Sequence, residues 1–296
     1  MLMQPRKGIN FKMTEIKLSL KNVSFTYGEG TPFEIKALNN VSLNIKSGKV
    51  TGIIGHTGSG KSTLVQMLNG LLRPSAGQVL LDGEDIWANP KEISKIRFRV
   101  GLVMQYPEYQ LFEETVRKDI AYAPINMGLD EAAINERVIE AANFAGVDES
   151  WLDKSPFDLS GGQKRRVAIA GIMAMRPDVL VLDEPAAGLD PRGKNTILGG
   201  IREYQRKSGA AVVLVSHSME DMAKYCDEII VMSKAGVAMQ GSCDEVFSNS
   251  ASLTDIGLDI PQITKIVSSI REYGIDINSS IYTVDDAYDA LVKILR

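Results

Sequence analysis

Residues 55–62, GHTGSGKS, place glycines, a lysine and a serine at the spacing of a phosphate-binding loop, between the strand-like VTGII and a helix-like segment. The glycines let the backbone turn its N–H groups toward an anion. Lys61 then reaches the β- and γ-phosphates as a point charge, and Ser62 supplies an oxygen to Mg²⁺. We expect His56 to be a solvent-facing spacer within this loop. The predicted ATP contacts of the loop are Gly55, His56, Thr57, Gly58, Ser59, Gly60, Lys61, Ser62 and Thr63.

Two carboxylates follow the apolar run VLVLDE at residues 179–184. Asp183, at the end of a buried strand, is suited to hold Mg²⁺, and Glu184 is suited to orient and deprotonate an attacking water. Two acids that merely end a strand are the plainer interpretation. The Lys61–Ser62 pair favours the catalytic one.

Tyr27 and His217 each follow a strand-like run, SFTY and VVLVSH. A lone tyrosine at such a place usually serves packing, and a lone histidine is usually structural. Beside the other motifs, we expect Tyr27 to stack on adenine, an interaction of roughly 1–3 kcal/mol. We expect His217 to sense the γ-phosphate.

A second glycine-rich stretch, LSGGQKRRVAIA at residues 159–170, opens a predicted helix. A serine and two glycines at a helix N-terminus combine bare N–H groups with the positive end of the helix dipole, which suits phosphate. The basic run Lys164–Arg165–Arg166 is interpreted as a solvated helix face.

The elements that must position these residues alternate in character. IKLSLKNVSFTY and VSLNIKSGKVTGIIG alternate with period two and predict strands, whereas residues 107–176 have helical periodicity. DVLVLDEP and AAVVLVSH are typical of buried parallel strands, whose function lies at their carboxyl ends. EIIVMSKAGVAMQGS predicts a hairpin with glycine at its turn. PQITKIVSSIREYG and TVDDAYDALVKILR predict helices near the end of the chain.

Composition excludes several classes of protein. The 296 residues carry a net charge of −4, which argues against nucleic acid as the main partner. Cys226 and Cys243 have no metal-site spacing and predict free thiols in a reducing compartment. No apolar run approaches the roughly 18–20 residues of a membrane span, so we expect a cytoplasmic chain whose membrane role comes through a partner.

The order of the motifs resembles an ABC ATPase cassette over residues 15–242. They occur as Tyr27, Gly55–Ser62, Gln105, Leu159–Gln163, Asp183–Glu184, the AGLD segment ending at Asp190, and His217. The resemblance implies a P-loop NTPase of the α/β class: a RecA-like core, an antiparallel β subdomain and a helical subdomain at about 107–176. It also implies an N-terminal extension over 1–14 and a small C-terminal domain over 243–296 near a dimer interface.

The resemblance also implies roles for single residues. Gln105 senses Mg²⁺ and water, Asp190 lies in the loop that links two ATP sites, and His217 is a switch. Two chains pack head to tail, and the signature segment, residues 159–163, covers the γ-phosphate held by the partner chain. The implied contacts in trans are Ser160, Gly161, Gly162 and Gln163.

The segment QYPEYQLFEETVRKDI, residues 105–120, is similar to cassettes of energy-coupling factor transporters, which import vitamins and transition-metal ions. The similarity implies a peripheral protein at the cytoplasmic face of the membrane. Its partners would be a second ATPase, a paralogue or a copy of itself, a membrane scaffold called T, and a membrane protein S that selects the substrate. Residues 106–112, the docking segment, are predicted to bind the scaffold through Pro107, Leu111, Phe112 and the charge of Glu108. Packing inside the helical subdomain is the alternative for these side chains.

Three rival functions remain at this stage: another type of ABC importer, a non-transport ABC ATPase acting on DNA ends or ribosomes, and an inactive regulatory cassette. The non-transport proteins carry long coiled coils, metal-binding cysteines or two cassettes in one chain, and this sequence has none of these. The presence of Lys61, Asp183, Glu184 and His217 argues against an inactive cassette.

Overall fold

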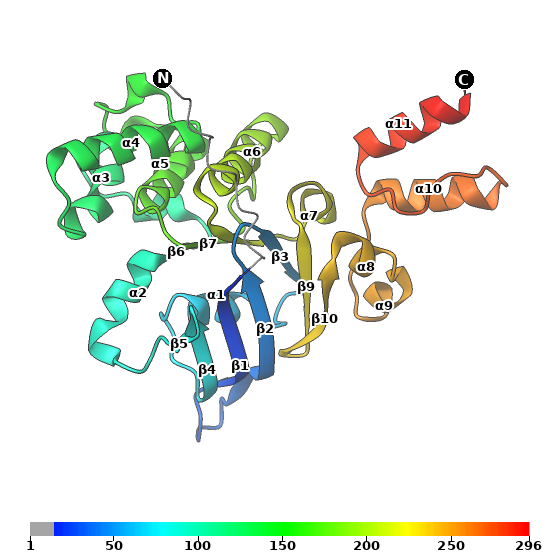
Figure 1. Cartoon of the computed structure of the whole chain (residues 1–296), viewed down its shortest axis with the longest axis horizontal. Helices are drawn as coiled ribbons and strands as arrows, with labels where there is room; N and C mark the ends of the chain where they lie inside the picture. The colour runs from blue at the N-terminus through cyan, green and yellow to red at the C-terminus, as the bar shows by residue number, and fades with distance from the viewer. Residues whose placement is uncertain (1–14, 296) are drawn as a thin grey trace, which may run out of the picture.

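Two β-sheets frame the molecule in a computed structural model that describes residues 15–295 (Figure 1). The predicted extension over residues 1–14 lies outside the described residues. The larger sheet has the strand order β10-β9-β3-β8-β7-β6 and is parallel except at β10, which runs antiparallel to β9. Its strands are β3 (Val50–Gly55), β6 (Val100–Val103), β7 (Val179–Asp183), β8 (Ala211–Val215), β9 (Glu228–Ser233) and β10 (Gly236–Ser242).

The smaller sheet is antiparallel, with the order β2-β1-β4-β5. Its strands are β1 (Ile16–Tyr27), β2 (Ile35–Lys46), β4 (Ala76–Leu81) and β5 (Glu84–Asp85). The helix α1 (Lys61–Leu68) shares a core with this sheet, because its Leu64 and Leu68 are fully buried in the same cluster as Leu18 and Ile45. The phosphate-binding loop is therefore held between a strand of one sheet and a helix that packs on the other.

The central sheet is buried on both faces, as its unbroken apolar runs predict. Along β8 the side chains alternate between two cores: Val212 and Leu214 belong to the cluster on the side of α6, and Val213 and Val215 belong to the cluster shared with α1. All four are essentially inaccessible to solvent. The carboxyl ends of β3, β7 and β8 consequently meet at one edge of a rigid sheet, where the loops that follow them carry the site.

Two groups of helices lie at opposite ends of the molecule in Figure 1. The helices α3, α4 and α5 pack against one another at one end of the molecule, and α10 and α11 lie at the other end. The bounds of the first eight are α1 as above, α2 (Ile93–Arg99), α3 (Val116–Asn126), α4 (Glu131–Ala145), α5 (Gly161–Met173), α6 (Pro191–Ser208), α7 (Met219–Tyr225) and α8 (Cys243–Phe247). Short 3₁₀ helices occupy Pro90–Glu92, Pro107–Gln110, Glu149–Trp151 and Pro156–Asp158.

The C-terminal part is built from four helices. After α8 come α9 (Ser250–Asp255), α10 (Gln262–Glu272) and α11 (Val284–Leu295). Phe247 and Leu253, from α8 and α9, are buried in the large core of the cassette. The helices α10 and α11 instead enclose a small core of their own, which includes Val267 and Ala287. Both helices were predicted from the sequence, whereas α8 was not, although Ser242 and Glu245 form a capping box at its start.

The hairpin of β9 and β10 is present, but the glycine expected at its turn is not the turning residue. Lys234 and Ala235 adopt the left-handed conformation, with φ of 47° and 64°, and Gly236 is the first residue of β10. Their φ values are those of a tight hairpin turn with two left-handed positions. The sequence preference for glycine at such positions is overridden here.

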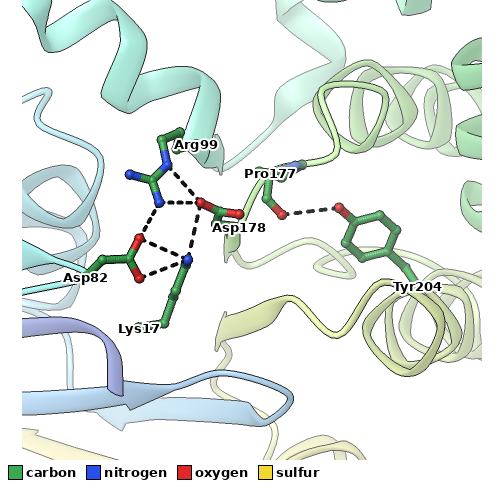
Figure 2. A network of polar contacts seen from close by, with 6 residues as sticks. All are labelled: Lys17, Asp82, Arg99, Pro177, Asp178 and Tyr204. Carbon is green, nitrogen blue, oxygen red and sulfur yellow. Dashed lines mark hydrogen bonds and ion pairs between the residues drawn. The ribbon is translucent and has the colours of Figure 1, made fainter. Parts of the chain in front are cut away.

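A network of ion pairs joins the antiparallel sheet to the central one (Figure 2). Lys17 of β1 contacts Asp82 at 2.9 Å and Asp178 at 3.4 Å, and Arg99 at the end of α2 joins both of the same carboxylates. The pKa of Asp82 is lowered, since its bonds to Lys17 and Arg99 outweigh its partial burial. The network thus spans β1, α2 and the residue before β7.

Candidate active site

The phosphate-binding loop owes its shape to residues without a side chain. Gly60, the residue before α1, has a φ of 103°, and a Cβ placed on it would lie 2.5 Å from the carbonyl oxygen of Ala37. Gly55, at the end of β3, is equally restricted, because a Cβ would lie 2.5 Å from the carbonyl oxygen of Met232. Any larger residue at either position would displace the loop from its neighbours.

Lys61 is 7% exposed and begins α1. Its Nζ donates to the carbonyl oxygens of Gly55 at 2.6 Å and His56 at 3.1 Å. Burial lowers the pKa of the Lys61 ammonium, while Glu184 and Asp183 oppose that shift. The cation therefore sits inside the loop, flanked by the two predicted carboxylates. The His56 side chain is exposed, as predicted for a spacer, and its Nδ1 contacts only the neighbouring Thr57 carbonyl at 2.8 Å.

Asp183 and Glu184 stand at the carboxyl end of β7. Burial raises the pKa of Asp183, although a hydrogen bond from Ser62 and the charge of Lys61 act in the other direction. Burial, followed by repulsion from Asp183, raises the pKa of Glu184 to about 7. A carboxylate with a pKa close to the working pH is matched to proton abstraction.

Glu184 departs from ordinary strand geometry, which no sequence pattern indicates. Its φ is 52°, in the left-handed region, and its N–H donates to the carbonyl of Val215 at 3.1 Å. The buried Oε1 has no hydrogen-bond partner among the described residues. A strained backbone with a buried acceptor held open is characteristic of functional sites.

His217 lies two residues beyond β8 and faces Glu184. Its Nε2 is 3.6 Å from Oε1 of Glu184, which is too long for a direct hydrogen bond. Burial and the nearby Lys61 lower the pKa of His217, so the ring is mainly neutral at pH 7. A neutral imidazole beside the predicted base can donate a hydrogen bond from one ring nitrogen and accept one at the other without carrying a charge.

A cleft of about 430 Å³ gathers most of the predicted nucleotide-binding side chains. Tyr27 and the 55–63 loop line one part of it, and Gln105, Asp183, Glu184 and His217 line another. Tyr27 is 42% exposed, packs edge-on against Phe25 and places its Oη 3.3 Å from Oγ1 of Thr63. Its ring therefore has a free face at the rim of the nucleotide cleft.

The cleft also contains three residues that the sequence reasoning missed: Ile35, Lys36 and Ala37, at the start of β2. Ile35 is 64% exposed, which is unusual for a large apolar residue in a strand. Ile35 is the direct cross-strand partner of Tyr27, so the two side chains lie side by side and extend the apolar surface on which a planar base can pack. The signal in the sequence that could have found these residues is that β2 follows closely after Tyr27 in the chain.

Mg²⁺ fits the residues at the inner end of the nucleotide cleft. The Ser62 hydroxyl and the Asp183 carboxylate are hydrogen-bonded neighbours there, and oxygen ligands of this kind suit a hard divalent cation. The raised pKa of Asp183 marks a buried carboxylate with too little positive charge around it. Gln105 lines the same cleft and can add an amide oxygen.

The signature segment does not line the nucleotide cleft of its own chain. Ser160 caps α5: its Oγ accepts from the Gln163 amide at 3.4 Å, and Gln163 Oε1 accepts from the Ser160 amide at 2.8 Å. Ser160 and Gly161 are exposed at this helix end. Asp190 likewise caps α6, accepting from the Gly193 amide at 2.6 Å, and is absent from the cleft.

Two expectations about charged residues are wrong. Arg165, taken for part of a solvated face, has a side chain only 6% exposed, and Glu108, expected to offer its charge to a membrane partner, is its ion-pair partner. Arg165 donates from Nε at 2.9 Å and from Nη2 at 2.6 Å to the two carboxylate oxygens. Among the proposed docking residues, Pro107 is buried and Leu111 is half-buried, whereas Tyr109 and Phe112 are 84% and 57% exposed.

Residues 38–187 match the family described as ABC transporter. The energy-coupling factor transporter ATP-binding protein EcfA2 of Caldanaerobacter subterraneus is 51% identical over 279 residues, which cover 94% of this chain and 98% of that protein. No described helix is long and apolar enough to cross a membrane.

Solved structures agree with these sequence matches. CbiO1 from Clostridium perfringens, part of the ABC transporter complex cbiONQ, superposes with a TM-score of 0.73 at 39% identity and covers 86% of this chain and 100% of that one. A bacterial ABC transporter cassette solved as a dimer has a TM-score of 0.69 at 31% identity, covering 76% and 98%. The fold predicted from the sequence is confirmed, and the chain belongs to the ATP-binding proteins of energy-coupling factor transporters, which are ABC-type ATPases.

Proposed function

We propose that this chain hydrolyses ATP in a head-to-tail pair of cassettes and thereby powers a membrane transporter of the energy-coupling factor type, with Glu184 as the general base. Glu184 carries the proposal. It follows the buried Asp183 on β7, has a pKa near 7, and faces the same cleft as Lys61 and His217.

The residues divide the work of hydrolysis. Lys61 and the amides of the loop bind the β- and γ-phosphates, and Tyr27 with its cross-strand neighbour Ile35 forms the surface on which the base stacks. Glu184 takes a proton from the attacking water, and His217 fixes the position of the γ-phosphate beside it. Ser62, Asp183 and Gln105 would hold Mg²⁺, which when bound neutralises charge on the phosphates.

The exposed signature segment supports the two-chain arrangement. It presents the N-terminus of the 13-residue helix α5 to solvent, where backbone amides and the helix dipole favour an anion. Because it does not line the cleft of its own chain, its phosphate ligand belongs to a second cassette, either a paralogue or a copy of this chain. ATP then contacts both chains, and loss of the γ-phosphate lets them separate.

A groove beside the docking segment supports a membrane scaffold as the partner on another face. It has a volume of about 180 Å³ and is lined mainly by apolar atoms of Leu111, Phe112, Tyr122, Val167 and Ile172. Phe112 packs edge-on against Tyr122 at 4.9 Å, and both rings are about half exposed. An amphipathic cytoplasmic helix of the scaffold T fits such a groove. The substrate-selecting protein S would then complete a transporter for a vitamin or a metal ion, and this chain would lie at the cytoplasmic face.

Asp119 replaces Glu108 as the charge that a basic residue of the partner would meet. It lines the groove and accepts from the amides of Phe112 at 3.4 Å and Glu113 at 3.2 Å. Burial raises its pKa, and these amides only partly compensate. A cation from the partner would remove that cost.

Substitution Glu184→Gln tests the catalytic role. It removes the base and keeps the shape of the side chain, so we expect ATP hydrolysis to fall by roughly 10²–10⁴ while ATP binding is retained. Turnover is measured per site in the complex purified from membranes, since a second, intact site would mask the loss. Near-normal turnover at the mutated site would reject Glu184 as the base.

Leu111→Asp tests the docking groove. A carboxylate in the groove should prevent recovery of the membrane partners with the chain. Leu111 also packs against the main core, so the variant is compared only after it is shown to bind ATP and to unfold cooperatively. Tyr273→Ala, which removes a ring that is 88% exposed at the end of α10, is the control. Undiminished recovery of the partners with the Leu111→Asp chain would exclude this groove.

A further inference from the structure

Arg165 joins two segments that each begin at a residue of the nucleotide cleft. Its guanidinium binds both carboxylate oxygens of Glu108, and its Nη1 donates to the carbonyl oxygen of Ala187. Glu108 lies three residues beyond Gln105, and Ala187 lies three residues beyond Glu184. We propose that Arg165 is a positioning residue for ATP hydrolysis, which holds the Glu184 turn at a fixed place relative to the docking segment and the signature helix.

The first link, from Arg165 to Glu184, is short because the chain turns directly after Glu184. The Ala187 amide donates to the carbonyl of Glu184 at 3.2 Å, so residues 184–187 form a closed turn. Arg165 donates a hydrogen bond to the carbonyl oxygen of Ala187, the last residue of that turn. A shift of the guanidinium is therefore passed to the turn that begins at Glu184, whose amide is held by the carbonyl of Val215 but whose Oε1 has no partner among the described residues.

The second link runs to the docking segment. Tyr106 has a φ of 56°, and this left-handed residue turns the chain from Gln105 at the cleft to the 3₁₀ helix that carries Glu108. The Tyr106 ring also lies 5.8 Å from the guanidinium carbon of Arg165. Burial would raise the pKa of Glu108, but the hydrogen bonds from Arg165 lower it below its ordinary range, so the pair is ionised.

The third link runs to the signature segment. Arg165 belongs to the second turn of α5, which begins at Gly161. Near the start of that helix, Gly162 lies so close to the segment after Ala187 that a Cβ on it would be 3.2 Å from Cδ2 of Leu189. The first two turns of α5 thus meet the Glu184 turn at Ala187 and the segment just beyond it at Leu189.

Stability alone does not account for a charge buried at this junction. Replacing a buried ion pair by apolar residues of similar volume is often neutral or stabilising. The planar fork of arginine can bind a carboxylate with one edge and a carbonyl with its remaining N–H, which the single ammonium of lysine cannot do. The contacts of Arg165 with Glu108 and Ala187 together therefore require arginine. An ion pair that only stabilised the fold could be replaced by apolar residues of similar volume.

The test compares three variants of the complex purified from membranes, under single-turnover conditions. Arg165→Gln should lower the rate of hydrolysis by roughly 10- to 100-fold, the usual effect of misplacing a catalytic group by about 1 Å. The KM for ATP should stay within about twofold, because Arg165 does not line the nucleotide cleft. Arg165→Lys should keep the fold and recover only part of the rate.

The paired replacement Glu108→Leu with Arg165→Met separates positioning from folding. It should unfold at a temperature equal to or above that of the wild type and still hydrolyse ATP slowly. Arg202→Gln is the matched control, since it breaks a bidentate pair between α6 and Asp227, at 2.7 Å for both bonds, which shares no partner with Arg165. It should keep the wild-type rate.

Full activity in Arg165→Gln or in the apolar pair would overturn the inference, as would an equal loss of rate in Arg202→Gln. The inference rests on the proposed role of Glu184, and the two can fail separately. If Glu184→Gln abolishes hydrolysis and Arg165→Gln does not, only the inference is lost. If Glu184→Gln has no effect, the proposed function itself is lost.

Discussion

Glu184 should make the chain less stable at alkaline pH, and Glu184→Gln should remove that loss. The folded state raises the pKa of this carboxyl from 4.5 to about 7, through burial and the neighbouring Asp183. The folded chain therefore binds the proton more tightly than the unfolded chain does. The contribution of this carboxyl to the free energy of unfolding is fully present below pH 4.5. That contribution is lost as the pH rises through about 7, where the folded chain gives up the proton. Glutamine cannot ionise and has no such dependence.

The size of the effect follows from the shift. One pKa unit corresponds to about 1.36 kcal/mol, so the change from 4.5 to about 7 sets an upper limit of roughly 3.4 kcal/mol. The Glu184 side chain is 12% exposed at the wall of an open cleft, and water there screens part of the cost. We expect Glu184→Gln to stabilise the chain by about 1–3 kcal/mol at pH 8.5 and by close to zero at pH 4.5.

The assay is urea unfolding of both chains, free of nucleotide, at pH 4.5 and pH 8.5. The strained φ of Glu184 is common to both proteins, and so are the other titrating groups, so the difference between the two pH values isolates the Glu184 carboxyl. A gain that is the same at both pH values would refute the reasoning, because it would mean that the carboxyl titrates alike in the folded and unfolded states. Replacing Glu184 by aspartate gives a check with the charge retained.

Three further predictions concern other parts of the molecule. Tyr27→Ala should weaken ATP binding by about 10- to 100-fold through lost stacking, whereas Tyr27→Phe should bind normally, as judged by equilibrium dialysis; equal affinities for all three chains would remove Tyr27 from the site. Ser160→Arg should leave ATP binding by the isolated chain intact and impair ATP-dependent pairing in sedimentation, and a loss of affinity in the isolated chain would contradict the two-chain arrangement. Gly200→Ala should destabilise the chain by roughly 3 kcal/mol or more in thermal unfolding, because its Cβ would lie 1.8 Å from the carbonyl oxygen of Phe144. Gly199→Ala, whose Cβ would meet nothing within 4 Å, should be neutral or stabilise by up to about 1 kcal/mol. Similar values for the two variants would contradict the close packing of α6 on α4.

The nucleotide cleft was largely predictable because its chemistry is local in sequence. Lys61 and Ser62 follow their glycines directly, and Asp183 and Glu184 end an apolar run that can only be a buried strand. Parallel strands bring such loops to one edge of the sheet, so the meeting of β3, β7 and β8 follows from their type. Gln105, by contrast, was placed by family resemblance, since no local pattern distinguishes it.

Features that depend on contacts between distant segments were not predictable. Ile35 reaches the cleft only because β2 pairs with β1, which carries Tyr27. The left-handed backbone of Glu184 accompanies a hydrogen bond from its amide to Val215, a residue of another strand. The basic run that includes Arg165 has the composition of a solvated face, and the residue that makes Arg165 a buried one is Glu108, which precedes it by 57 positions.

The ability of Glu184 to accept a proton and its cost in folding stability have the same origin. Burial beside Asp183 raises the pKa of Glu184 into the range where it can accept a proton, and the same burial opposes its ionisation in the folded chain. The left-handed φ of Glu184 adds backbone strain, of the order of 1–3 kcal/mol for such a residue. A turn held in that state needs restraint from its surroundings, and the described contacts supply it from two sides: Val215 binds the Glu184 amide, and Arg165 binds the carbonyl of Ala187 at the other end of the turn.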